Sequence, residues 1–190
     1  MFTVGITGGI ATGKSLATDF FAAKDIDIID ADKISRSLQE PGEVGYEAIV
    51  KKFGTAVLSK DQTINRSELR TLAFSNKDTK KWLEDLMHPM IGEKVLEGFK
   101  QAKSKWAIYS APLWSEKNKF DRIMVIDAPR SQQIERIIKR DNSSEELAGQ
   151  IVDQQLHRHQ RVGFANDFLM NDSSIETVSY THLTLPTTTI

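Results

Sequence analysis

The feature that most constrains this chain is a glycine-rich stretch near its start, Gly8-Gly9-Ile10-Ala11-Thr12-Gly13-Lys14-Ser15. It follows a short apolar, β-rich segment (2–7) and precedes a segment (14–24) whose apolar residues recur at helical spacing. A buried strand, a tight turn and an amphipathic helix in this order give the stretch the context of a G-x-x-x-x-G-K-[ST] phosphate loop. The sequence therefore predicts an α/β domain that binds a nucleotide phosphate.

The residue types of this loop suit phosphate chemistry. Glycines allow the backbone to turn tightly and to direct successive N–H groups at phosphate oxygens, and the N-terminus of the following helix faces the same anion. Lys14 is expected to reach the β- and γ-phosphates, and the Ser15 hydroxyl to bind Mg²⁺. With ATP and Mg²⁺ as the expected ligands, the predicted nucleotide-binding residues are Gly8, Gly9, Ala11, Thr12, Gly13, Lys14, Ser15 and Leu16.

Strand and helix patterns alternate along the rest of the chain, which predicts a mostly parallel sheet with helices on both faces. The expected strands are 2–7, 26–30, 106–111, 122–127 and 168–170, and the expected helices are 45–53, 67–74, 78–86, 89–103, 131–140 and 144–159. The stretch between the second and third strands is too long for one crossover and indicates an inserted helical subdomain. We expect one domain over 1–178, with a nucleotide core (1–40 and 104–178), an insertion (41–103) and a lid (136–160).

Composition excludes several classes of protein. The formal net charge is −1, so nucleic acid is not an expected partner. There is no cysteine, which excludes disulfides and thiolate sites, and no apolar run approaches the roughly 18 to 20 residues of a membrane span. We expect a cytoplasmic protein with no membrane partner. The threonine-rich residues 179–190 are expected to be disordered or not native to the fold.

Two carboxylates follow the second expected strand, in the segment Asp30-Ala31-Asp32. Ligands of such sheets bind at the carboxyl ends of the strands, where a carboxylate can accept a proton from a substrate hydroxyl. Asp is also a favoured N-cap for a helix starting here. The spacing allows both roles, one structural and one catalytic.

Beyond these motifs, residues 2–172 resemble the dephospho-coenzyme A kinase family. The phosphate loop is similar to the family's T-G-G-I-G-S-G-K-S-T, and the segment 30–36 to its D-A-D-x-I-x-R. Further matches, in chain order, are Pro41-Gly42, Phe53-Gly54, Asn65-Arg66-Ser67-Glu68-Leu69, His88-Pro89, Ala111-Pro112-Leu113-Trp114-Ser115-Glu116, the Q-x-x-R-x-x-x-R of Gln133 to Arg140, and Gln155, Arg158, Arg161, Ala165, Asp167 and Asn171.

The resemblance implies a P-loop kinase fold with a five-stranded parallel sheet. It implies ATP-dependent phosphorylation of the ribose 3′-hydroxyl of dephospho-coenzyme A, the last step of coenzyme A biosynthesis. It makes Asp32 the catalytic base or hydroxyl-orienting group and Lys14 a catalytic cation. It places Asp32, Arg36, His88 and Pro89 on the acceptor side and Arg140 in a lid over the phosphates. Members of this family normally continue with another helix after the position of Asn171. Residues 174–178 show only the first turn of such a helical pattern before the threonine-rich segment.

Other interpretations stay open. His88-Pro89 also suits a loop and the first residue of a helix, Arg136 and Arg140 a solvated helix face, and the tryptophans packing. The chain departs from the family at Ala11, Leu16, Trp114-Ser115 and Asn166. A different nucleoside or small-metabolite kinase is one alternative function. A nucleotide-gated switch is another. The lack of the N-K-x-D motif with which GTPases read the base argues against a switch, since in Asn76-Lys77-Asp78 the Asp comes one position early.

Overall fold

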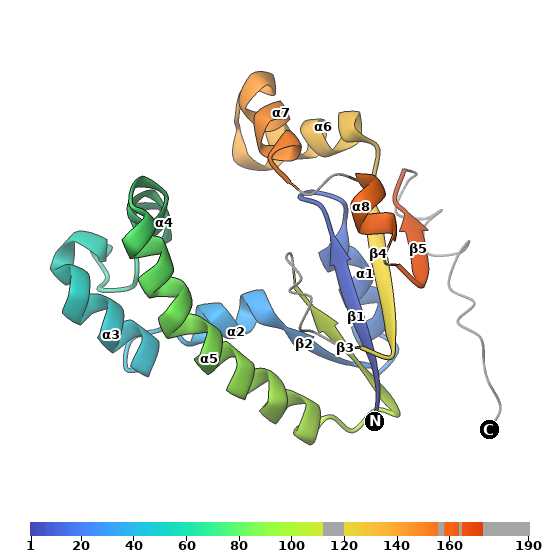
Figure 1. Ribbon diagram of the computed structural model, residues 1–190, viewed down its shortest axis with the longest axis horizontal. Helices are drawn as coiled ribbons and strands as arrows, with labels where there is room; N and C mark the ends of the chain where they lie inside the picture. The colour runs from blue at the N-terminus through green and yellow to red at the C-terminus, as the bar shows by residue number, and fades with distance from the viewer. Residues whose placement is uncertain (112–119, 156–157, 164, 173–190) are drawn as a thin grey trace. The chain divides into compact units, whose positions relative to one another are not determined.

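The computed structural model describes residues 1–111, 120–155, 158–163 and 165–172 (Figure 1). The strands are β1 (Phe2–Gly8), β2 (Asp27–Asp30), β3 (Trp106–Ser110), β4 (Arg122–Asp127) and β5 (Asp167–Met170). The α-helices are α1 (Lys14–Ala22), α2 (Ala31–Ser37), α3 (Val44–Phe53), α4 (Arg66–Ser75), α5 (Lys77–Gln101), α6 (Arg130–Asp141), α7 (Glu145–Asp153) and α8 (Arg158–Gly163), and η1 (Gly54–Val57) is a 3₁₀ turn. The family match over 112–116, the packing interpretation of Trp114 and the expectations for the segments 174–178 and 179–190 concern residues outside these ranges.

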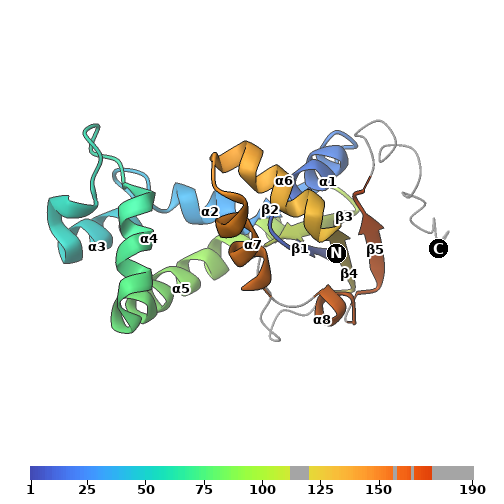
Figure 2. The ribbon, with the colours of Figure 1, turned by 90° about the horizontal axis from the view of Figure 1, so that it is seen from above.

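The strands form a five-stranded sheet in the order β2-β3-β1-β4-β5. β1 pairs in parallel with both of its neighbours, Val4 lying opposite Ile108 on β3 and Ile6 opposite Met124 on β4, and β4 pairs in parallel with β5. Helices α1 and α8 lie on opposite faces of this sheet in Figure 2. The predicted parallel α/β sheet is confirmed, and β1 with its glycine loop is its central strand.

An apolar core holds the sheet together. Strands covered on both faces read as nearly continuous apolar runs, as the first strand here does. The buried members of this cluster are Val4, Ile6, Phe21, Ile108, Met124, Ile126 and Leu169. Trp106 packs edge-on against Phe21 with ring centroids 5.6 Å apart. The packing interpretation of this tryptophan is therefore confirmed.

The chain divides into two compact units, one made of residues 1–28 and 103–190 and the other of residues 29–102. The second unit has a core of its own, formed by Leu38, Ile49, Val57, Ile64, Leu69 and Met87. Trp82 joins this core and meets the Phe53 ring edge-on at 5.5 Å, so it too is a packing residue. The helical residues between the second and third strands therefore form a unit with its own core, and α2 belongs to that unit.

One expected helix boundary is wrong. Residues 78–86 and 89–103 were expected to be separate helices, but α5 runs without a break from Lys77 to Gln101 with Pro89 inside it. An interior proline removes one helical hydrogen bond and costs about 3 kcal/mol. The helix continues because apolar residues on both sides of Pro89, including Met87 and Ile91, pack into the second unit's core.

A second boundary is also wrong. One helix was expected over 144–159, whereas α7 ends at Asp153 and α8 begins at Arg158. Between them, the side chain of Gln155 is drawn to the glycine loop, where its Oε1 accepts a hydrogen bond from the Ile10 N–H at 2.8 Å. A long-range contact thus replaces the helical continuation that the local pattern favours.

Candidate active site

The glycine loop joins the end of β1 to the start of α1. Ala11 has a φ of 57° and Gly13 a φ of 96°, both in the left-handed region. This conformation costs an L-residue such as Ala11 on the order of 1–3 kcal/mol. At Gly13 a Cβ atom would lie 2.1 Å from Asn171 Nδ2, so only glycine fits. The loop is therefore a strained turn, in which Ala11 adopts a backbone conformation that glycine would adopt at a lower cost in free energy.

The N-terminus of α1 is left open at this loop. Among the residues that the structure describes, no side chain caps α1, whereas Asn65 caps α4 and Asn76 caps α5 by accepting N–H bonds from the first turn. The unpaired N–H groups of a helix start and the positive end of its dipole attract an anion. Ser15 and Leu16 lie exposed in this first turn. The geometry suits a phosphate group at the position of the missing cap.

Lys14, the first residue of α1, extends to the neighbouring strand. Its Nζ donates a hydrogen bond of 3.0 Å to the Oγ of Ser110, which is fully buried at the end of β3. The amine thus lies at the carboxyl edge of the sheet, where ligands of parallel α/β folds bind. Sequence reasoning placed Ser110 only within a strand and missed this contact.

Side chains from distant parts of the sequence hold the loop's backbone. Gln133 Nε2 donates to the Ile10 carbonyl at 2.7 Å, and Arg136 Nη1 donates to the Ala11 carbonyl at 3.1 Å. Asn171 Nδ2 donates to the Thr12 carbonyl at 2.8 Å. Arg136 also donates to the Asn171 carbonyl at 3.0 Å, which joins these ties into one network. Three successive carbonyl groups of the loop are therefore fixed from outside.

The loop tip is also packed against apolar side chains. Ile10 and Ala11 lie against the buried cluster of Ile134, Ile137 and Ala148, which joins α6 to α7. Inside the loop, the buried Thr12 hydroxyl donates to the Gly9 carbonyl at 2.9 Å. The Cβ of Ala11 therefore has apolar neighbours that a glycine could not contact, which offsets part of its backbone strain.

An ion pair with a buried carboxylate lies beside the same loop. Asp127, 1% exposed at the end of β4, is paired with Arg158 and lies 3.8 Å from Arg161 Nη2. Burial lowers the pKa of Arg161, while Asp127 acts in the opposite direction. A Cβ on Gly9 would come within 3.0 Å of Arg161 Nη2, so this guanidinium lies against the loop. The cluster adds a cation near the predicted phosphate site.

Of the two arginines expected on α6, the structure joins Arg136 to the loop and holds Arg140 elsewhere. Arg140 forms a bidentate pair with its neighbour Asp141, with distances of 2.7 Å, and its side chain is 56% exposed. The hydrogen bond that the Asp141 carboxylate accepts from Arg140 raises the pKa of this arginine. The solvated-face interpretation is therefore wrong for Arg136, and the lid role of Arg140 stays a prediction.

The predicted acceptor-side residues all belong to the second unit. Asp30 caps α2, because its Oδ1 accepts hydrogen bonds from the N–H groups of Asp32 at 2.9 Å and Lys33 at 3.1 Å. The structural role foreseen for one of the two carboxylates thus falls to Asp30. Asp32 and Arg36 lie exposed one helical turn apart on α2.

His88 and Pro89 lie exposed on α5, which packs against α2 in the same unit. The interpretation of Pro89 as the first residue of a helix is wrong. The placement leaves both side chains accessible to a ligand.

The fold and the loop together define a P-loop phosphotransferase. The sequence profile of the family described as "Dephospho-CoA kinase" matches residues 2–177. The chain belongs to the dephospho-CoA kinase family. It is 42% identical over 173 residues to the "Dephospho-CoA kinase" of Vibrio parahaemolyticus, covering 89% of this chain and 85% of that one.

Two further relatives agree. The "Dephospho-CoA kinase" of Coxiella burnetii is 38% identical over 179 residues, covering 92% of this chain and 90% of its own. A solved structure, "Dephospho-CoA kinase from Campylobacter jejuni", superposes with a TM-score of 0.66 at 28% identity and covers 93% of this chain and 91% of that one. The predicted family and kinase fold are therefore confirmed. Among the described residues, no helix has the length and apolar character needed to cross a membrane.

Proposed function

We propose that this protein transfers the γ-phosphoryl group of Mg²⁺-bound ATP to the ribose 3′-hydroxyl of dephospho-coenzyme A, with coenzyme A and ADP as products. A bond forms between the hydroxyl oxygen and the γ-phosphorus, and the bond from this phosphorus to the β-γ bridging oxygen breaks. The observation that carries the proposal is the match of the dephospho-CoA kinase family to residues 2–177. The phosphate loop of this chain, with a helix N-terminus that is uncapped within the described residues, agrees with that match.

The nucleotide half of the reaction rests on the loop. The open N-terminus of α1 and the loop N–H groups bind the phosphates, and Lys14 neutralises charge that develops during transfer. Within the described ranges no three His, Asp or Glu side chains cluster as a metal site. Mg²⁺ commonly takes most of its ligands from water and substrate phosphates, and we propose the exposed Ser15 hydroxyl in the first turn of α1 as a protein ligand. When bound, Mg²⁺ supplies further neutralisation of phosphate charge.

The acceptor half rests on α2 and α5. Because Asp30 is engaged as a cap, we assign the acceptance of the hydroxyl proton to Asp32. Arg36, His88 and Pro89 are exposed in the same unit and are proposed to hold the acceptor nucleotide. Arg140 is proposed to exchange Asp141 for the ATP phosphates when nucleotide binds, since an exposed ion pair is worth only about 0–1 kcal/mol.

The test is the rate of ADP release from MgATP with and without dephospho-coenzyme A. We expect strong stimulation by the acceptor, lost in Lys14→Ala. If the folded protein binds ATP but dephospho-coenzyme A leaves the rate unchanged, the proposed substrate is wrong. A screen of other nucleosides with free ribose hydroxyls then follows.

A further inference from the structure

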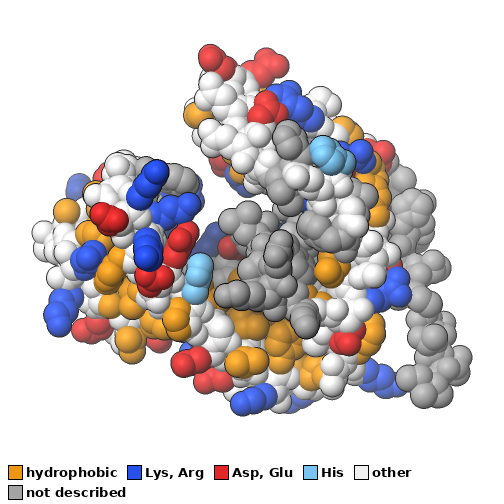
Figure 3. All heavy atoms as spheres, viewed as in Figure 1, with side chains coloured by type: hydrophobic (Ala, Val, Ile, Leu, Met, Phe, Trp, Pro, Cys, Tyr) orange, Lys and Arg blue, Asp and Glu red, His pale blue; other side chains and the backbone are white. Residues whose placement is uncertain are grey.

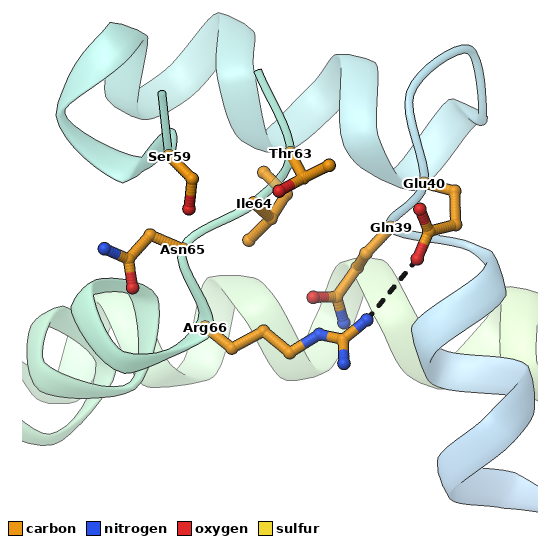
Figure 4. A pocket seen from close by; sticks show the side chains of 7 residues that line it. All are labelled: Gln39, Glu40, Ser59, Thr63, Ile64, Asn65 and Arg66. Carbon is orange, nitrogen blue, oxygen red and sulfur yellow. Dashed lines mark hydrogen bonds and ion pairs between the residues drawn. The ribbon is translucent and has the colours of Figure 1, made fainter. Parts of the chain in front are cut away.

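The second unit contains a cavity of about 350 Å³ that the proposed chemistry does not use (Figure 4). Its walls come from two segments: the turn that follows α2, and the turn that leads from η1 into α4. In Figure 4, Arg66 extends across the cavity toward Gln39 and Glu40. The lining residues are Gln39, Glu40, Ser59, Thr63, Ile64, Asn65 and Arg66.

The cavity wall is rigidly built. Leu58 and Ile64 form an antiparallel bridge, closed by a hydrogen bond of 2.8 Å from the Ser59 N–H to the Thr63 carbonyl. The Asn65 N–H donates to the Val57 carbonyl at 2.8 Å, which fixes the turn to the unit's core. Arg66 is therefore presented from a well-held backbone as the first residue of α4.

The polar groups of the cavity are balanced between donors and acceptors. Arg66 Nη2 and Glu40 Oε1 lie 3.5 Å apart, and the two side chains are 47% and 56% exposed. A long, exposed ion pair of this kind is weak, so a ligand can insert between its members. A guanidinium donor beside a carboxylate acceptor matches the C=O and N–H of a secondary amide, and the buried Ile64 adds an apolar surface. With one positive and one negative side chain, the lining favours a neutral, amide-bearing chain over a phosphate.

The cavity lies in line with the proposed acceptor residues. α2 carries Asp32 and Arg36, and the chain continues directly into Gln39 and Glu40 at the cavity. At a rise of 1.5 Å per residue, Asp32 lies about 7.5 Å along the helix from Ser37, the last residue of α2, and Gln39 follows two residues later. An acceptor whose hydroxyl lies at Asp32 therefore needs an extended arm to enter the cavity.

We propose that this cavity binds the neutral, amide-bearing arm of the acceptor, the pantetheine portion of dephospho-coenzyme A, with Arg66 and Glu40 bonding to an amide of that arm. The proposal rests on the proposed function for the identity of the acceptor. It makes Arg66 and Glu40 substrate-binding residues that act on affinity and not on the chemical step.

The kinetic test compares Arg66→Ala and Glu40→Ala with the wild-type protein, since each substitution removes the polar group proposed to bond to the arm. Losing one hydrogen bond to the arm should raise the KM for dephospho-coenzyme A about 3- to 10-fold and leave kcat and the KM for ATP unchanged. Arg70→Ala is the matched control, since Arg70 is exposed on the same helix but does not line the cavity. Variants that keep the wild-type KM, or that lower kcat alone, overturn the proposal.

A second measurement uses 4′-phosphopantetheine, which carries the arm without the nucleoside. It should bind the wild-type protein in calorimetry, and Arg66→Ala should weaken this binding at least 3-fold, whereas Arg70→Ala should not. Equal binding by all three proteins, or no binding to the wild type, contradicts the proposal. Because this measurement involves no phosphoryl transfer, it decides about the cavity even if dephospho-coenzyme A proves not to be a substrate.

Discussion

The phosphate loop and the proposed acceptor residues are held very differently. Side chains of α6 and of the segment after β5 fix the loop's backbone, and an apolar cluster packs against its tip. Asp32, Arg36, His88 and Pro89 are all exposed on helices of the second unit. We infer that the fold builds the nucleotide half in advance, whereas the substrate completes the acceptor half. Preorganisation suits the half that must stabilise developing charge.

The largest expected effect concerns the acidic pair. Asp32→Asn should lower kcat by about 10²- to 10⁴-fold, because a general base is lost. Asp30→Asn is the matched control: asparagine caps helices as well as aspartate, so α2 and activity should persist. Steady-state rates of ADP release measure both. Equal losses in the two variants would show that the two carboxylates do not divide their roles as proposed.

Next in size is Lys14→Ala, which should lower kcat/KM for ATP by about 10²- to 10³-fold through lost stabilisation of phosphate charge. Ser110→Ala removes only the hydroxyl that accepts from the Lys14 amine and should cost less than about 10-fold. The same kinetic assay checks both. A Ser110→Ala loss as large as that of Lys14→Ala would mean that the orientation of the amine, and not its charge, limits the reaction.

A smaller effect is expected on stability in the acceptor half. Pro89→Ala restores a backbone N–H inside α5, and we expect it to stabilise the protein by about 1–2 kcal/mol, a rise in Tm of about 2–8 °C. The KM for the acceptor should rise at the same time if Pro89 contacts the substrate. Thermal unfolding and kinetics of one preparation measure both. A lower Tm would show that α5 is adapted to the proline.

The smallest effect is expected within the preorganised loop. Ala11→Gly relieves the left-handed strain but removes a methyl group that packs against the α6–α7 cluster. Glycine also loses more backbone freedom on folding than alanine, and together these two costs oppose the relief of strain, so Tm should change by no more than about 2 °C. Ala11→Val, with a branched side chain at positive φ, should unfold at a clearly lower temperature. Equal Tm values for Val and Gly variants would contradict the strained geometry.

Local patterns in the sequence predicted the sheet, because strands such as β4 contain a continuous apolar run, here residues 123–126. They predicted the phosphate loop because glycine, lysine and serine at this fixed spacing are typical of nucleotide-phosphate binding. They could not decide which aspartate caps α2, because both Asp30 and Asp32 are allowed there. The predicted helix break at Pro89 was wrong, because apolar packing on both sides of the proline outweighs its local penalty.

Long-range contacts account for the rest. Arg136 and Arg140 are one turn apart on α6, and spacing alone does not tell which guanidinium reaches the loop. Gln155 and Asn171 meet the loop from more than 140 positions away in the chain. The family motifs contain all of these residues but give no partner for any of them. These contacts depend on how β4, β5 and α6 pack beside the loop, and only the folded structure shows that packing.

The most direct test of the comparison is one set of KM values, for ATP and for dephospho-coenzyme A, in Arg136→Lys and Arg36→Lys. Lysine keeps the charge but cannot reproduce the forked contacts of Arg136 with the Ala11 and Asn171 carbonyls. We predict that Arg136→Lys raises the KM for ATP about 10-fold with little effect on the acceptor, and that Arg36→Lys does the reverse. If each variant raises both KM values equally, the nucleotide and acceptor halves are not separately built, and the account is contradicted.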